Sequence, residues 1–264
     1  MRYACRLLTF IGLIASIYAG ILTFPEATFA HHITYKNYEI WSDRPIDPAI
    51  TAVLEDATRR IERSELYNST QKFHIFFCNS SWRLGLYDML FDTRLSGATD
   101  TMITRNVFIR ESNIAANQIV PSPEAQSVLD LSQRPLSYFL AHEMTHVMES
   151  RAFGRLMVAR FPLWLNEGYA DYIGKGGDFD FDENRNLLQH GDQRLDPERS
   201  GLYRRYNLEV ALLLDKENQQ ISEIYNAPPI EADLLQVLRN NASPDADSAA
   251  HPRAADIKGY PHAQ

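Results

Sequence analysis

The chain has 264 residues, and 45% of them are hydrophobic, which is enough for one sizeable core or for a catalytic domain with a small lobe. It carries 34 acidic and 26 basic residues, giving a formal net charge of −8. An acidic surface repels the phosphate backbone of nucleic acids, so we expect no nucleic-acid partner.

The N-terminal segment has the composition of an export signal. A short basic start (1–6) is followed by Leu7–Phe24, a run of 18 residues without charge, and then by small residues. This order is typical of a secretory signal peptide, with Thr28 and Ala30 in the −3 and −1 positions of a cleavage site. We therefore predict that residues 1–30 are removed and that the protein is periplasmic or secreted. The alternative is an uncleaved signal anchor that associates with the inner membrane, because such a run can nearly span a bilayer.

Cysteine usage adds little to the question of export. Removal of residues 1–30 would take away Cys5 and leave Cys78 as the only cysteine, so the mature chain has no internal disulfide. Cys78 ends an apolar run, and we predict a buried thiol that packs as a small hydrophobic side chain.

Residues 33–120 alternate between β and α patterns. Strands are predicted at Ile33–Trp41, Lys72–Cys78 and Thr104–Arg110, and an amphipathic helix at Pro45–Leu66. The last of these strands comes shortly before the next predicted helix, so we place it at the edge of the sheet beside that helix. An ordinary internal strand is the alternative. The following stretch, 116–133, predicts a connecting loop.

The next predicted helix carries two histidines four residues apart. Pro135 suits its first position and Gly154 its C-terminal stop. His142 and His146 then lie on one face of the helix, one turn apart. In this H-E-x-x-H arrangement the two imidazoles hold Zn²⁺, and the glutamate after the first histidine, Glu143, activates a water molecule. The alternative is a pair of histidines with a purely structural role.

A second helix, from about Pro162 to Gly174, supplies further acidic groups. Zinc takes three protein ligands at a catalytic site and keeps a fourth position open, and Glu167 is the candidate for the third ligand. Asp171 lies four residues further on, on the same face. Because a ligating histidine usually donates its other ring N–H to a carboxylate, we predict that Asp171 orients one of the two histidines.

The pair of segments 142–146 (His-Glu-Met-Thr-His) and 166–171 (Asn-Glu-Gly-Tyr-Ala-Asp) resembles the gluzincin metallopeptidases, a peptidase MA-like group. In that family the third zinc ligand is a glutamate about twenty residues after the second histidine, often within Asn-Glu-Gly. The resemblance covers about residues 135–175 and extends more weakly to about 240. A metzincin fits badly, because Glu149 and Ala152 stand where a glycine and a third histidine are required.

The resemblance implies an α+β, zincin-like fold over residues 31–241, with a small N-terminal mixed sheet and helices followed by a mainly helical C-terminal part. Further helices are predicted at Leu202–Asp215, Ile221–Tyr225 and Glu231–Asn240. Related peptidases place a tyrosine or histidine from this part near the metal, where it donates to the developing oxyanion. Tyr203 is our first candidate, Tyr206 the second and His190 an outside choice. Residues 242–264 are rich in Ala, Ser, Pro and Asp and are predicted to be disordered.

These features together predict an exported zinc-dependent peptidase that acts on a peptide or protein substrate, with Glu143 as general base. The resembling aminopeptidases carry a Gly-x-Met-Glu-Asn signature upstream, and the nearest segment here, 96–102, lacks its glutamate. Endopeptidase action is therefore favoured. Two other classes stay open: a catalytically idle zinc-binding protein that recognises a partner in the cell envelope, and a membrane-anchored assembly factor with purely structural helices. The sequence gives no indication of oligomeric state.

Overall fold

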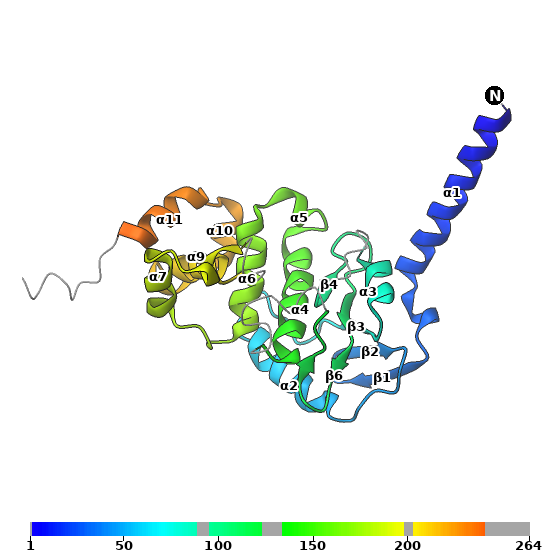
Figure 1. Ribbon diagram of the computed structural model, residues 1–264, viewed down its shortest axis with the longest axis horizontal. Coiled ribbons are helices and arrows are strands. Elements are labelled where there is room, and N and C mark those ends of the chain that lie inside the picture. The colour runs from blue at the N-terminus through cyan, green and yellow to red at the C-terminus, as the bar shows by residue number, and fades with distance from the viewer. Residues whose placement is uncertain (1, 89–94, 123–133, 198–202, 241–264) are drawn as a thin grey trace, which may run out of the picture.

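The computed structural model describes residues 2–88, 95–122, 134–197 and 203–240 (Figure 1). This part of the chain forms a five-stranded mixed sheet near the N-terminus, followed by a mainly helical part. The arrangement confirms the predicted fold class. The predicted tail at 242–264 lies outside the described residues.

The N-terminal part holds most of the strands. Its elements are α1 (Arg2–Thr23), the short 3₁₀ helix η1 (Pro25–Thr28), β1 (His31–Tyr35), β2 (Tyr38–Ser42), α2 (Ile50–Ile61), β3 (Phe73–Cys78), α3 (Ser81–Tyr87), β4 (Gly97–Thr99), β5 (Val107–Arg110), β6 (Ser112–Asn113) and β7 (Gln118–Ile119). The helical part consists of α4 (Leu136–Phe153), α5 (Met157–Arg160), α6 (Leu163–Lys175), α7 (Phe181–Gln189), η4 (Gln193–Leu195), α9 (Arg204–Ala211), the π-helical turn η5 (Leu212–Lys216), α10 (Ile221–Asn226) and α11 (Glu231–Asn240).

The strands of the main sheet lie in the order β1-β2-β3-β5-β4. β2, β3 and β5 run parallel to one another, and β1 and β4 are antiparallel to their neighbours. The single strand predicted over Ile33–Trp41 was wrong, because this stretch is the hairpin β1–β2. The chain turns at Lys36, which has a φ of 52°. Glycine or asparagine usually marks such a left-handed position, and the lysine concealed the turn.

The edge of the sheet next to α4 differs from the prediction. β5, within the predicted strand Thr104–Arg110, lies between β3 and β4 and is internal. The edge strand is β4, whose Thr99 pairs with Val107 of β5. A strand of three residues is too short for an alternating pattern to reveal it.

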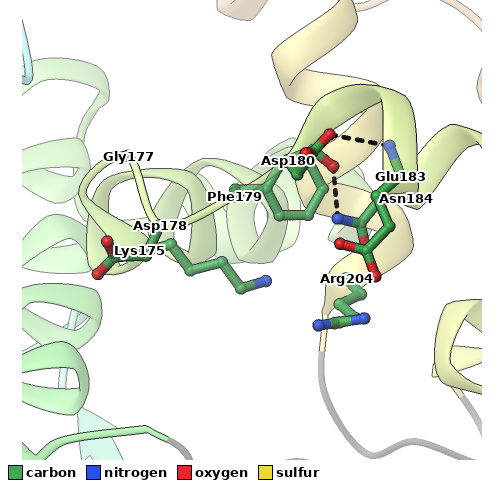
Figure 2. A pocket seen from close by; sticks show the side chains of 8 residues that line it. All are labelled: Lys175, Gly177, Asp178, Phe179, Asp180, Glu183, Asn184 and Arg204. Carbon is green, nitrogen blue, oxygen red and sulfur yellow. Dashed lines mark hydrogen bonds between the residues drawn. The ribbon is translucent and has the colours of Figure 1, made fainter.

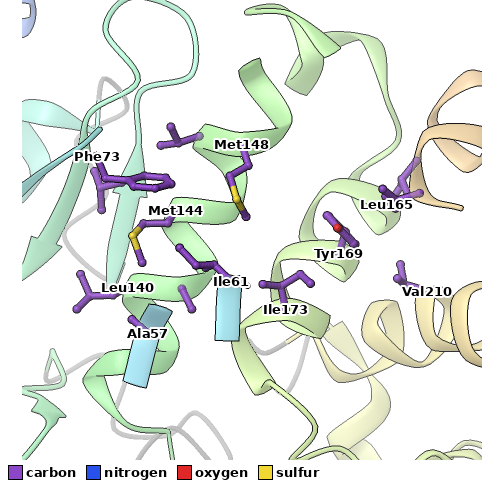
Figure 3. Close-up of a cluster of buried hydrophobic side chains, with 14 of the residues drawn as sticks. Ala57, Ile61, Phe73, Leu140, Met144, Met148, Leu165, Tyr169, Ile173 and Val210 are labelled. Carbon is purple, nitrogen blue, oxygen red and sulfur yellow. The ribbon is translucent and has the colours of Figure 1, made fainter. Parts of the chain in front are cut away.

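Helix α4 is the centre of the molecule. It contacts α2, β4 and β5 on one side and α6 on the other, and α6 in turn packs against α9 (Figure 1). Apolar side chains of α4 fill the spaces between these elements, among them Leu140, Met144 and Met148, which meet Ile61 of α2 and Ile173 of α6 (Figure 3). All residues of α4 from Leu136 to Ser150 are buried. A helix enclosed on every side gives its polar residues fixed positions.

Helix α1 extends away from the domain (Figure 1). Within the described ranges, no helix has both the length and the apolar character required to cross a membrane. The prediction for Cys78 is confirmed: the thiol is free and buried, and burial raises its pKa.

The helical part contains a carboxyl group that has no hydrogen-bond partner among the described residues. Both side-chain oxygens of Glu209 in α9 are fully buried, and the Arg205 Nε lies 3.3 Å from one of them without hydrogen-bond geometry. Arg205 instead donates to Glu231 over 2.7 Å. Burial and the negative charge of Glu231 raise the pKa of Glu209 to about 8.

A raised carboxyl pKa makes stability depend on pH. Between about pH 4.5 and pH 8 the folded state binds the Glu209 proton and the unfolded state does not, so stability falls as pH rises through this window. We expect Glu209→Gln to stabilise the protein at pH 8.5 by an amount on the order of 3 kcal/mol, and to have little effect at pH 4. Urea unfolding of both proteins at the two pH values measures the difference. The exposed Glu217→Gln is the control, and an equal effect of Glu209→Gln at both pH values would contradict the expectation.

Candidate metal centre

Helix α4 carries three of the predicted site residues. It begins one residue after the predicted start, since Pro135 is extended (φ −70°, ψ 161°) and Leu136 is the first helical residue. It ends at Gly154, whose φ of 98° stops the helix as expected. The rings of His142 and His146 lie 4.9 Å apart, centroid to centroid, and nearly perpendicular. The helix therefore presents both imidazoles to one point, as the spacing predicted.

Helix α6 brings the third candidate to the same point. It runs from Leu163 to Lys175, one residue beyond the predicted end, and is capped by Gly176 in the left-handed conformation. Gly168, next to Glu167, lies so close to α9 that a Cβ atom would be 2.6 Å from the backbone oxygen of Tyr206. The glycine thus permits the close approach of α6 and α9 that holds the carboxylate in place.

Three ligand atoms converge at this point. The Glu167 Oε2 lies 3.3 Å from the His142 Nε2 and 3.7 Å from the His146 Nε2. One ligand atom from each of the three residues falls within 4.8 Å of the others. Ligands that bind a tetrahedral ion at about 2.0–2.1 Å lie roughly 3.3–3.4 Å from one another. The three side chains can therefore hold a metal ion with only small side-chain movements.

The carboxylates at the centre favour the binding of a cation. Burial would raise the pKa of Glu167, but the two histidines outweigh it and hold the pKa of this carboxyl well below its usual range. Burial would likewise lower the pKa of His146, and the carboxylates of Glu167 and Glu149 instead raise it well above its usual value. The carboxylates create a strongly negative potential at this point, which suits a divalent cation.

Glu143 lies beside this cluster and is held by the edge strand β4. The Thr99 hydroxyl is 2.7 Å from the Glu143 Oε2 and 3.0 Å from the Glu143 backbone oxygen, and can donate to either. Gly97 is so close that a Cβ atom there would be 2.7 Å from the Glu143 Oε1. Burial raises the pKa of the Glu143 carboxyl, although His142, His146 and Thr99 act in the opposite direction. A fixed carboxyl with a raised pKa suits proton transfer near neutral pH.

A carboxylate that the sequence analysis did not assign orients His146. The Glu149 side chain is fully buried, and its Oε2 lies 2.8 Å from the His146 Nδ1. The Tyr225 hydroxyl donates to the other oxygen of Glu149 over 2.6 Å and lies 3.3 Å from the Asn166 Oδ1. Asn166 precedes Glu167, so one chain of contacts joins both ligand-bearing helices. The i, i+3 spacing of His146 and Glu149 was the signal that could have revealed this contact.

The contact between Glu149 and His146 should matter for metal affinity. We expect Glu149→Ala to weaken metal binding by about 10–100-fold, because the imidazole loses the partner that fixes its tautomer and orientation. Competition with a chromophoric chelator measures the affinity, with circular dichroism to establish that the variant is folded. Glu62→Ala, at an exposed glutamate, is the control and should bind as the wild type does. A folded Glu149→Ala protein with unchanged affinity would show that the contact has no such role.

Asp171 does not take the predicted role in the described part of the chain. It is fully buried and accepts hydrogen bonds from Arg134 (2.9 Å), Asn207 (3.0 Å), Tyr138 and Lys175. The His142 Nδ1 has no hydrogen-bond partner among these residues. Tyr138, which donates to Asp171, lies beside His142, with ring centroids 5.9 Å apart. Its buried contacts tie α6 to α4 and α9.

The three candidates for an oxyanion donor take different positions relative to His142. Tyr203 stacks on His142 with ring centroids 6.0 Å apart, and the charge of Glu167, together with burial and Glu143, raises the pKa of its phenol. Tyr206 stacks on Tyr203 at 5.8 Å and so lies one ring further from His142. His190 is exposed at the end of α7, where its Nδ1 lies 2.8 Å from the Asn186 backbone oxygen. Of the three, Tyr203 is the one whose ring stacks on His142.

A separate surface pocket of about 460 Å³ lies where α6 leads into α7 (Figure 2). It is lined by Lys175, Gly177, Asp178, Phe179, Asp180, Glu183, Asn184 and Arg204. None of the three ligand candidates is among them. Burial lowers the pKa of Lys175 to about 7 despite the neighbouring Asp171. Of the lining residues, Lys175 also donates to the buried Asp171.

No family model matches the chain, and neither the curated proteins nor the solved structures include a significant match.

Proposed function

We propose that this chain is an exported zinc-dependent peptidase. The observation that carries the proposal is the convergence of His142, His146 and Glu167 within 4.8 Å, with Glu143 next to them on α4. Two imidazoles and one carboxylate are a donor set that zinc takes at catalytic sites, where a further position stays open for water or substrate. A carboxyl group beside such a set is the expected general base of metal-assisted hydrolysis.

Zinc bound by these residues supplies a Lewis acid that polarises a carbonyl and lowers the pKa of water toward about 7. Glu143 accepts a proton from the attacking water and then delivers it to the leaving amine. The Thr99 hydroxyl, 2.7 Å from the Glu143 Oε2, helps to position this carboxylate. Tyr203, whose ring stacks on His142, donates a hydrogen bond from its phenol hydroxyl to the developing oxyanion.

The edge strand suggests how a substrate binds. β4 pairs with β5 on one side, and within the described residues no strand pairs with its other side. An extended peptide that adds to this edge would run past Thr99 and therefore past Glu143. We accordingly favour an endopeptidase that binds an unfolded stretch of a peptide or protein.

A peptide-library digest tests the proposal. The purified full chain is incubated with the library after zinc loading, after treatment with a chelator, and after renewed addition of zinc. We expect cleavage that the chelator abolishes and that zinc restores. A zinc-loaded protein that cleaves no peptide would support the idle binding protein instead. A protein that takes up no zinc would contradict both.

A further inference from the structure

A second hydrophobic cluster lies on the face of the sheet opposite α4. Side chains alternate between the two faces of a strand. Accordingly Phe77 of β3 belongs to the main core, and Phe76 belongs to the second cluster together with Phe108 of β5. Helix α3 contributes Leu84 and Tyr87 to this cluster. Its remaining buried members are Cys78 of β3 and two residues from the segment predicted to be cleaved, Leu22 and Phe29.

Phe29 is packed like a core residue. Its side chain is 8% exposed, and its ring centroid lies 5.1 Å from that of Phe76 and 5.8 Å from that of Tyr87. The Arg83 guanidinium covers it at 5.1 Å. Leu22, at the end of α1, is 4% exposed in the same cluster. Two side chains of the N-terminal segment therefore complete the apolar layer over β3 and β5.

Hydrogen bonds fix the segment on the domain as well. The Tyr18 hydroxyl donates to the Leu86 backbone oxygen over 2.7 Å. The Thr28 hydroxyl lies 2.6 Å from that of Tyr87, and Arg83 donates to the Thr28 backbone oxygen over 3.0 Å. These bonds span 55 to 68 positions in the sequence. Thr28, the predicted −3 position of a cleavage site, is thus part of a folded corner of the domain.

We infer that residues 18–29 are a permanent part of the folded domain and that the N-terminal segment is retained. Signal peptides are normally removed before the domain folds. A chain starting at His31 would therefore have to fold without residues 18–29. Such a chain would uncover the sides of Phe76 and Tyr87 that Phe29 covers, as a contiguous aromatic surface. Soluble domains rarely leave such a surface open. The packing of Leu22 and Phe29 therefore favours retention of the segment over its removal.

Helix α1 has an exposed part and a packed part, which supplies a control. Five large apolar side chains before position 18 are each more than 50% exposed: Phe10, Ile11, Leu13, Ile14 and Ile17. The last part of the helix, from Tyr18 to Leu22, joins the cluster. The stability of the domain should therefore depend on residues after position 17 and not on those before it.

The segment also supports the strand that holds Glu143. Ala98 of β4 packs against the second cluster and pairs with Phe108 of β5, while its neighbour Thr99 contacts Glu143 on the other face. The inference about retention does not depend on the proposed peptidase activity, because it rests on the packing alone.

The first test is the N-terminus of the folded protein. The full chain is produced in a bacterium that processes exported proteins and is purified in mild detergent because of the exposed side chains of α1. Intact mass and N-terminal sequencing should show that residues 18–29 remain. A stable, folded product that starts at His31 would overturn the inference.

The second test uses substitutions in the full chain. We expect Phe29→Ala to lower the melting temperature by roughly 6–12 °C, as for other buried phenylalanines in a domain of this size. Ile14→Ala, which removes an apolar side chain of the exposed part of α1, should leave the melting temperature unchanged. Leu22→Ala is a milder variant in case Phe29→Ala does not fold, and should also lower it. Equal melting temperatures for Leu22→Ala, Ile14→Ala and the wild type would contradict the inference.

Discussion

Replacement of the proposed general base, Glu143→Gln, is expected to slow peptide hydrolysis by about 10²–10⁴-fold and to leave the metal content unchanged. The amide has nearly the same size as the carboxylate and can still accept a hydrogen bond from Thr99, so the side chain should keep its place beside β4. It cannot accept the proton of the attacking water. The measurement is the rate of cleavage of a fluorogenic peptide found by the library digest, together with metal analysis of the same sample.

His142→Ala is the companion variant for this experiment. It removes a metal ligand, so both the metal and the activity should be lost. The pair of results separates the roles of two neighbouring residues on α4. If Glu143→Gln hydrolysed peptides at the rate of the wild type, the proposed role of Glu143 would be wrong, although the metal site itself could stand.

The largest effect on stability is expected for Asp171→Ala, a loss of about 3–5 kcal/mol. The substitution removes the carboxylate that accepts hydrogen bonds from Arg134, Lys175 and Asn207 in a fully buried position. Lys175 would then be a buried amine without its counter-charge. The melting temperature should fall by roughly 6–15 °C, measured by differential scanning calorimetry.

Asp178→Ala provides a matched control. The Asp178 side chain is 82% exposed and lies 3.6 Å from an Arg60 nitrogen, a surface ion pair that should contribute at most about 1 kcal/mol. The same variant also distinguishes a structural role of Asp171 from a role in orienting a metal-binding histidine. If it weakened metal binding without lowering the melting temperature, Asp171 would have the orienting role that the sequence first suggested.

The parts of the centre that lie close together in the sequence were predictable. The spacing of His142 and His146 on a helix fixes their relative position, because the helix leaves few other arrangements. Glu167 came from the family resemblance and depends on how α6 packs between α4 and α9. Gly174 permits the close contact with α4, and Gly168 permits the close contact with α9. The convergence of Glu167 with the histidines is the one long-range prediction about the site that the geometry bears out.

The choice between carboxylates was not predictable in the same way. Glu149 and Asp171 are both within reach of the histidines in sequence terms, and only the packing decides which one faces an imidazole nitrogen. Thr99 was also missed, because it lies on a three-residue strand that gives no periodic signal. The N-terminal segment shows the same limit, since composition describes an export signal equally well whether or not Phe29 is later buried.

Metal content is the most direct measure of the central proposal. The purified full chain is equilibrated with excess zinc, desalted and analysed by plasma mass spectrometry, beside His146→Ala and Glu167→Ala. We predict about one zinc ion per wild-type chain and a loss of most of it in both variants. A wild-type chain that retains no zinc, or a folded Glu167→Ala chain that binds zinc as tightly as the wild type, would contradict the proposed centre.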